Sequence, residues 1–290
     1  MSDFWPVDLV QALSQRRGVV FLGAGASASC KSESGVRQPC WTDLLTNLAT
    51  GLSEPDSNAF KTAMSKSRLL DAAQILVDTL SPPLLHSSLI KIFANNTIKP
   101  SSLYESVNLV DQPVVMTTNY DRMYERFWET ELNEPLSGPK PPLMVSHYKE
   151  TDVVDNLRSD RRLLLKLHGT INKPRDLVLS RSQYSRARYE HANFFRVVSA
   201  LMLTRTILFV GCGFNGDPDI DLLLEDSAFT AQSTAPHYAL VEKGRHASEI
   251  RSLQSAFNIT LLEYDNENGD HAEMLTQMAT LAQLVESNRI

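Results

Sequence analysis

The stretch GVVFLGAGASAS, residues 18–29, decides the fold of this chain. Four apolar residues at positions 19–22 are followed at once by glycine, alanine and serine. A short apolar run that ends in glycine is typical of a buried parallel strand. We therefore predict a strand that turns tightly into a helix at Gly23.

The glycines of this stretch also suggest a ligand. Gly23, Gly25 and Ala28 have the spacing of the looser dinucleotide-binding fingerprint. Glycine lets the backbone turn tightly and approach a diphosphate, and the following helix directs N–H groups at the anion. A tight strand-to-helix turn without a ligand has the same local pattern, so this loop alone leaves both interpretations open.

The composition is that of a globular protein. The 290 residues are 42% hydrophobic, which is enough apolar material for a sizeable core in one domain over residues 1–290. The net charge of −6 argues against direct nucleic-acid binding, which needs a basic surface. No run approaches the ~18 apolar residues of a membrane span, and residues 1–10 lack the pattern of a signal peptide. We therefore expect a cytoplasmic protein that does not bind a membrane.

The cysteines argue against a metal site. Cys30, Cys40 and Cys212 are scattered, and none belongs to a C-x-x-C pair. Three such residues can build neither a disulfide framework nor a cysteine zinc site. We therefore expect no bound metal.

Strand-like and helix-like segments alternate along the chain. A helical insertion is predicted over residues 52–100, where apolar residues repeat every three or four positions and no strand pattern occurs. Strands alternating with helices indicate an α/β fold that is Rossmann-like, with a mostly parallel sheet and helices on both faces. The further predicted strands are residues 113–118, 163–167, 206–210, 237–241 and 259–264, with a short strand or a turn at 177–179 and a helix over 182–203.

Polar residues follow two of these strands. Thr118, Asn119 and Asp121 end the strand at 113–118, and His168 ends the strand at 163–167. Ligands of open α/β sheets bind outside the carboxyl ends of the strands, so these side chains are predicted to share a crevice. Asn119 or Asp121, taken alone, is better explained as a helix cap, and a single histidine is often structural. An imidazole at this place nevertheless suits acid–base chemistry.

A second glycine pair follows the strand at 206–210. Gly211 and Gly213 repeat the pattern of the first loop, and Asp217 and Asp219 then begin a predicted helix. Acidic residues in a first helical turn are also explained by the helix dipole.

Together, the motifs GAGAS, TNYD, KLHG and GCGFNGDPD, in this order, resemble those of the sirtuin-like domains of bacterial anti-phage defence. The resemblance covers nearly the whole chain and implies a Rossmann-like fold that binds NAD⁺. It implies that the first glycine loop anchors the diphosphate, that the second helps to hold the adenosine half, and that the TNYD and KLHG motifs carry the catalytic groups. The matching residues are Gly23, Ala24, Gly25 and Ser27 in the first loop, Thr118, Asn119 and Asp121, the catalytic histidine His168, and Gly211 and Gly213 in the second loop, followed by Asp217 and Asp219.

The resemblance also implies an activity. Protein-deacylating sirtuins carry a four-cysteine zinc ribbon, which this chain lacks, whereas the defence branch resembles NAD⁺ hydrolases that deplete the cell of NAD⁺. The expected reaction cleaves the nicotinamide–ribose bond to give nicotinamide and ADP-ribose, with NAD⁺ as the substrate and no other cofactor. The resemblance implies that Asn119 orients the ribose or the water, that His168 contacts a ribose hydroxyl and acts as general base, and that Asp121 supports Asn119 or stabilises positive charge.

Two other functions stay open from the sequence: a non-catalytic sensor of NAD⁺ or an ADP-ribose derivative, and a protein deacylase. The presence of both Asn119 and His168 favours the enzyme. The short members of the branch resemble proteins encoded with a HerA-type ATPase or another defence protein, so a homo-oligomer and such a partner are expected. The sequence leaves open whether the product is linear or cyclic ADP-ribose.

Overall fold

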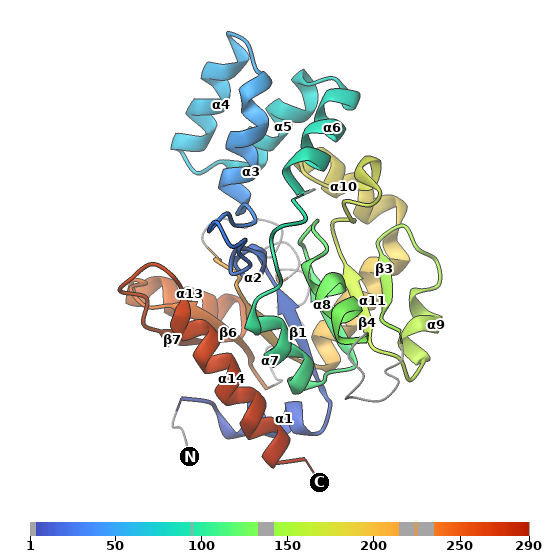
Figure 1. Cartoon of the computed structure of the whole chain (residues 1–290), viewed down its shortest axis with the longest axis vertical. Helices are drawn as coiled ribbons and strands as arrows, with labels where there is room; N and C mark the ends of the chain where they lie inside the picture. Colours follow the sequence, from blue (N-terminus) through green and yellow to red (C-terminus); the bar gives the residue numbers. More distant parts are fainter. Residues whose placement is uncertain (1–3, 94, 133–141, 215–223, 225–234, 290) are drawn as a thin grey trace.

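The predicted strand of the first glycine loop, β1 (Gly18–Leu22), is the central strand of a seven-stranded sheet (Figure 1). The computed structural model describes residues 4–93, 95–132, 142–214, 224 and 235–289. The strand order is β3-β4-β2-β1-β5-β6-β7, and every pairing among these strands is parallel. The α/β prediction is therefore confirmed, with a sheet that is wholly parallel in the described residues. The other strands are β2 (Val114–Thr117), β3 (Met144–His147), β4 (Leu163–Lys166), β5 (Thr206–Val210), β6 (His237–Glu242) and β7 (Ile259–Tyr264).

Helices bury both faces of this sheet. Val20 and Leu22 belong to one apolar core with α1, α7, α8 and α14, whereas Val19 and Phe21 belong to a second core with α9, α10, α11 and α13. Burial on two faces explains why the central strand is an unbroken apolar run. The helices of the two layers are α1 (Val7–Ser14), α7 (Ser102–Val110), α8 (Met123–Leu132), α9 (Val153–Arg158), α10 (Arg181–Glu190), α11 (Ala192–Thr204), α13 (Ala247–Phe257) and α14 (Ala272–Ser287).

A group of helices between β1 and β2 has its own apolar core. The group stands above the sheet in Figure 1, beyond the end that carries the short α2 (Ala24–Ala28). Its core includes Leu44, Leu76 and Leu89, and Tyr120 from the sheet end packs into it. The group consists of α3 (Trp41–Leu48), a 3₁₀ turn (Ala49–Gly51), α4 (Asp56–Ser65), α5 (Leu69–Thr79) and α6 (Pro82–Phe93). That residues 52–100 form an insertion stays a prediction. None of the helices in the described ranges is long and apolar enough to cross a membrane.

Three segments differ from the sequence prediction. The edge strand β3 was not predicted, because Met144–His147 is half exposed and has no apolar run. Residues 177–179 form no strand; instead the Val178 N–H donates to the His168 carbonyl at 3.1 Å. The single helix predicted over 182–203 is two helices, since the chain changes direction at His191. The helix expected from Asp217 lies outside the described residues.

We expect His237 to make the fold sensitive to acid. Its side chain is 4% exposed, its Nδ1 accepts a hydrogen bond from the Ile207 N–H at 3.3 Å, and burial lowers its pKa from 6.5 to about 4. The unfolded chain therefore binds a proton at His237 more readily than the folded chain. The free energy of unfolding keeps its full value above pH 6.5, as far as this group is concerned, and decreases as the pH falls toward 4. The loss is roughly 3 kcal/mol at about 1.4 kcal/mol per pKa unit.

Urea unfolding of a His237→Asn variant tests this expectation, because the amide oxygen of asparagine can accept the same hydrogen bond. The variant should lose much less stability than the wild-type chain between about pH 7 and pH 4.5. Equal losses in the two proteins would contradict the assignment to His237.

Candidate functional site

The two glycine loops contact each other directly at the carboxyl ends of β1 and β5. The Gly23 N–H donates to the Val210 carbonyl at 2.9 Å, and the Gly25 N–H donates to the Gly211 carbonyl at 2.8 Å. A Cβ on Gly23 would lie 2.5 Å from the Gly211 oxygen, and one on Gly211, whose φ is +69°, would lie 2.3 Å from the Ala26 nitrogen. Glycine is thus required here for backbone-to-backbone packing of the loops. The predicted reason, room for a diphosphate, does not account for the N–H groups of Gly23 and Gly25, because both already donate to carbonyls.

Asn119 is anchored to the first loop. Its Nδ2 donates to the Gly23 carbonyl at 2.8 Å and to the Ser27 hydroxyl at 2.9 Å. Its backbone N–H donates to the Thr117 hydroxyl at 3.0 Å, and this hydroxyl donates to the Leu22 carbonyl at 2.7 Å. Because both protons of Nδ2 are used, Oδ1 is the atom with which Asn119 can contact a ligand.

Asp121 does what its alternative interpretation predicted. Its Oδ1 accepts a hydrogen bond from the Met123 N–H at 2.9 Å, at the start of α8. The carboxylate is buried and lines the same cavity as Asn119. It therefore caps the helix and also borders the space in which a ligand would lie.

His168 lies just beyond the carboxyl end of β4. Its side chain is 3% exposed, and its ring stands edge-on to the Tyr184 ring with 5.7 Å between centroids. The next residue, Gly169, has a φ of +85°, and a Cβ there would lie 2.5 Å from the Asp176 carbonyl oxygen. Glycine thus permits a sharp turn of the chain directly after the histidine.

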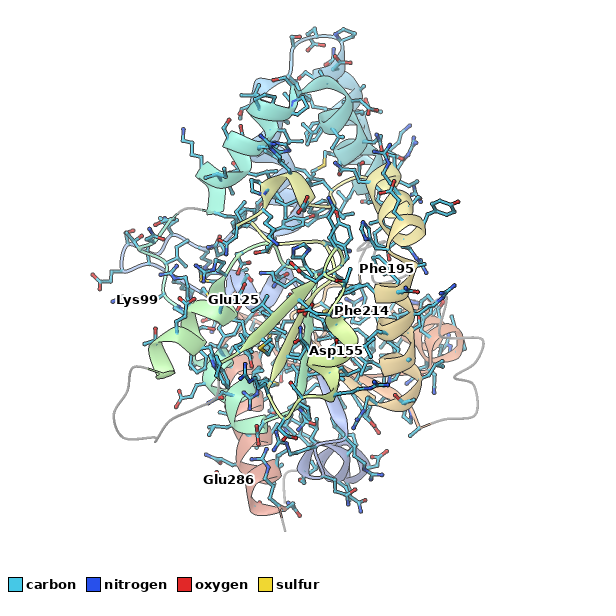
Figure 2. All side chains as sticks on the ribbon, turned by 90° about the vertical axis from the view of Figure 1, so that its right-hand side faces the viewer. Lys99, Glu125, Asp155, Phe195, Phe214 and Glu286 are labelled. Atoms are coloured by element: carbon cyan, nitrogen blue, oxygen red, sulfur yellow. The ribbon has the colours of Figure 1, made fainter. Side chains whose placement is uncertain are left out.

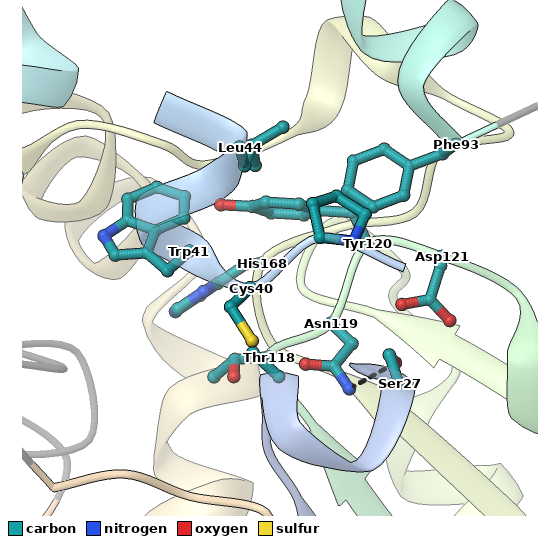
Figure 3. A pocket seen from close by; sticks show the side chains of 12 residues that line it. Ser27, Cys40, Trp41, Leu44, Phe93, Thr118, Asn119, Tyr120, Asp121 and His168 are labelled. Atoms are coloured by element: carbon teal, nitrogen blue, oxygen red, sulfur yellow. Dashed lines mark hydrogen bonds between the residues drawn. The ribbon is translucent and has the colours of Figure 1, made fainter. Parts of the chain in front are cut away.

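A small cavity collects the predicted catalytic residues (Figure 3). Its volume is about 50 Å³. A cavity needs roughly 10–15 Å³ to hold one water, so a water can be held beside these side chains. The lining consists of Ala24, Ser27, Pro39, Cys40, Trp41, Leu44, Phe93, Thr118, Asn119, Tyr120, Asp121 and His168.

A larger cavity of about 470 Å³ adjoins it, lined by the loop after β5 and by residues of β6 and β7. Ala24, Cys40 and Trp41 belong to the walls of both cavities, so the two spaces meet at these residues. The predicted residues Gly25, Gly211 and Gly213 line the larger one. Of all the predicted site residues that are described, only Gly23 lines neither cavity, and its contribution is the carbonyl that accepts from Asn119. Asp217 and Asp219 lie outside the described residues.

Charged residues of the larger cavity were not predicted. Glu242 ends β6 and pairs in register with Tyr264 of β7, and the Tyr264 hydroxyl and His271 Nδ1 are 2.8 Å apart. Burial, with a smaller contribution from the charge of Glu242, raises the pKa of Tyr264 to about 12. Arg245 follows three residues later; it donates to the Gly213 carbonyl and pairs with Glu249. The position of Glu242 at a strand end was the available signal, whereas nothing in the sequence singled out Arg245.

Cys40, which lines both cavities, is not an activated thiol. Burial, together with the nearby charge of Asp43, raises the pKa of the Cys40 thiol above its usual value of 9.0. A thiol reacts as the thiolate, which the raised pKa disfavours. Cys40 therefore serves as a packed part of the cavity wall. Among the described residues, no three histidine, cysteine or acidic side chains gather as metal ligands.

Comparison with known sequences identifies the family of this chain. The sequence model of the SIR2-like domain matches residues 113–262, which is just over half of the chain. The chain therefore belongs to the SIR2-like domain family, as the motifs of the four strand ends indicated.

Its relatives include proteins named NAD(+) hydrolase ThsA. The one from Enterococcus faecium is 26% identical over 245 residues, which are 80% of this chain and 45% of that protein. The one from Cytobacillus dafuensis is 24% identical over 81% of this chain and 43% of its own length. The one from Bacillus cereus (strain MSX-D12) is 27% identical over 44% of this chain and 25% of its own length. This chain therefore matches less than half the length of each of these relatives.

Proposed function

We propose that this chain is an NAD⁺ glycohydrolase, which releases nicotinamide and ADP-ribose. The observation that carries the proposal is the pair of adjoining cavities at the carboxyl ends of the strands. A dinucleotide has two unequal halves joined by a diphosphate. We assign the adenosine half to the larger cavity and the reacting bond to the smaller one, whose lining includes Asn119, Asp121 and His168. The names of the relatives, NAD(+) hydrolase ThsA, support the same activity.

The diphosphate would cross between the cavities near Ala24. Since the N–H groups of Gly23 and Gly25 are used between the loops, the negative charge has to be met by other groups. The guanidinium groups that line the larger cavity are those of Arg37 and Arg245. Both contribute a favourable electrostatic interaction with a diphosphate, and Arg37 has the greater freedom because Arg245 is already paired with Glu249.

The reaction breaks the bond between C1′ of the ribose and the nicotinamide nitrogen. The electron pair of this bond leaves with nicotinamide, which departs as a neutral molecule, and positive charge develops at C1′. The oxygen of a water then bonds to C1′, and its proton passes to a base. We assign the base to His168, the orientation of the ribose or the water to Oδ1 of Asn119, and stabilisation of the developing positive charge to the Asp121 carboxylate.

The biological role we propose is that of an NAD⁺-depleting effector in anti-phage defence, in a homo-oligomer and with an ATPase of the HerA type or another defence protein as partner. This rests on the resemblance of the motifs to that branch of the sirtuin-like proteins.

Incubation of the purified chain with NAD⁺ tests the proposal. Nicotinamide and ADP-ribose, linear and cyclic, are separated by chromatography, and release of one nicotinamide per NAD⁺ consumed is the expected result. Saturable NAD⁺ binding without release would identify a sensor. Absence of both binding and release, for the chain alone and for its complex with a partner, would refute the proposal.

Glu242 is expected to favour NAD⁺ over NADP⁺. A carboxylate at the end of a strand can accept from ribose hydroxyls, and it repels a 2′-phosphate. A Glu242→Lys variant should therefore lower the ratio of kcat/KM for NAD⁺ to that for NADP⁺ by roughly fivefold, as expected for a charge contact of about 1 kcal/mol. Asp270→Lys, which makes the same change of charge at another exposed acidic residue of the same cavity, is the matched control and should change the ratio by less than about twofold. Equal effects of the two variants would argue for the general charge of the cavity.

A further inference from the structure

A buried ammonium group lies beneath the turn that carries Asn119 and Asp121. Lys166, the last residue of β4, is 1% exposed. Its Nζ donates to the backbone carbonyl of Asp121 and lies 3.0 Å from Oε1 of Glu125, which is also buried. Glu125 belongs to the first turn of α8 and is labelled in Figure 2. Lys166 therefore connects β4 to the segment between β2 and α8.

Stability does not explain why a charged pair occupies this place. Removing two charges from water costs free energy that their attraction recovers only in part, and apolar residues of similar volume are often as stable in such positions. The contact that apolar residues cannot replace is the one to the Asp121 carbonyl. Lysine supplies an N–H donor to this carbonyl, and Glu125 neutralises the charge of the donor.

The position of this contact relates it to the site. Thr117 and Lys166 are paired in register on β2 and β4, so the turn after β2 begins beside Lys166. Asn119 is held from the β1 side by Gly23 and Ser27. The ammonium group holds the same turn from the β4 side, two residues before His168.

We propose that Lys166 is a positioning residue for the hydrolysis proposed above. It fixes the turn of residues 118–121 relative to His168, so that Asn119 and Asp121 stay aligned with the reacting bond. The inference rests on the proposed function for its consequence in turnover. Displacement of reacting groups by about 1 Å can cost roughly a hundredfold in rate, which is the order of the effect at stake.

Two variants separate positioning from stability. Lys166→Met combined with Glu125→Leu replaces the pair by apolar side chains, so the melting temperature should stay close to that of the wild-type chain while the Asp121 carbonyl loses its donor. We expect kcat to fall by at least about tenfold, with KM for NAD⁺ changed by less than about threefold.

Glu125→Gln keeps an acceptor for Nζ and keeps the contact to the carbonyl, but leaves a buried positive charge without its counter-charge. It should lower the melting temperature by about 5 °C or more and hold kcat within about threefold.

If Lys166 positions the turn, the double variant loses turnover but keeps its melting temperature, whereas Glu125→Gln loses melting temperature but keeps turnover. A merely structural pair would make turnover follow the melting temperature in both variants. A double variant that retains wild-type kcat, or that loses NAD⁺ binding and turnover together, would overturn the inference.

Hydrogen–deuterium exchange provides a readout that needs no turnover. In the double variant, peptides that cover residues 117–125 should exchange faster than in the wild-type chain, whereas peptides from β6 and β7 should be unchanged. Unchanged exchange over 117–125 would overturn the inference. If the wild-type chain and its complexes show no hydrolysis, the proposed function fails, and the exchange experiment still decides whether Lys166 holds the turn.

Discussion

Replacing His168 by alanine is expected to lower kcat for NAD⁺ hydrolysis by roughly a hundredfold or more, the effect of removing a general base. The ring lies at the carboxyl end of β4, is almost fully buried and lines the small cavity beside Asn119. NAD⁺ binding should change little, because the adenosine half is assigned to the other cavity. Steady-state kinetics of nicotinamide release, together with calorimetric titration of NAD⁺, measures both quantities.

His168→Gln is the matched variant for this experiment. Glutamine fills much of the same space and can form hydrogen bonds, but it cannot take up a proton near neutral pH. Loss of turnover in both variants, with a fold that melts as the wild-type protein does, supports the role of a base. Full activity in the alanine variant would rule it out, and full activity in the glutamine variant alone would assign His168 to hydrogen bonding.

Replacing Asn119 by alanine is expected to lower kcat by about a hundredfold, since the variant loses both the ligand-facing Oδ1 and the alignment of the site. The Nδ2 group holds the Gly23 carbonyl and the Ser27 hydroxyl, so its removal loosens the first glycine loop as well. A higher KM for NAD⁺ should therefore accompany the lower kcat, in contrast to the variants of His168. Kinetics over a range of NAD⁺ concentrations resolves the two effects.

Asn119→Asp distinguishes the two functions of this side chain. Aspartate keeps an acceptor where Oδ1 lies, but it cannot donate to the Gly23 carbonyl and would repel it. We expect this variant to be as impaired as the alanine variant. If Asn119→Asp retains most of the wild-type activity, the anchoring of the loop has no part in turnover.

The central strands were predictable because they are buried on both faces. Residues 19–22 and 207–210 are apolar throughout, and burial between two helical layers requires this composition. The edge strand β3 has only one neighbour and a partly exposed side, so Met144–His147 carries no such signal. The segment 177–179 is apolar because Leu177 and Leu179 pack into the core of the helical group, which local sequence cannot reveal.

The site was predictable where a residue type and a strand end coincide. Asn119, Asp121 and His168 each follow a strand, and parallel strands bring such positions to one edge of the sheet. The contacts that hold them were not predictable. The carbonyl that Asn119 holds comes from a residue 96 positions earlier in the chain, and the lysine beneath the turn reads in the sequence as one more residue of a strand. These contacts depend on packing between segments that only the assembled sheet brings together.

The helical group supplies part of the wall of the small cavity. Cys40 and Trp41 stand at the start of α3, and Phe93 ends α6. A volume of about 50 Å³ holds water but falls well below the roughly 300 Å³ of ordinary ligand pockets, so the proposed function requires this wall to move outward before nicotinamide and its ribose can bind. If the chain hydrolyses NAD⁺ as proposed, a neighbouring molecule that holds α3 and α6 against the sheet would slow hydrolysis, and one that draws these helices outward would speed it without touching Asn119 or His168.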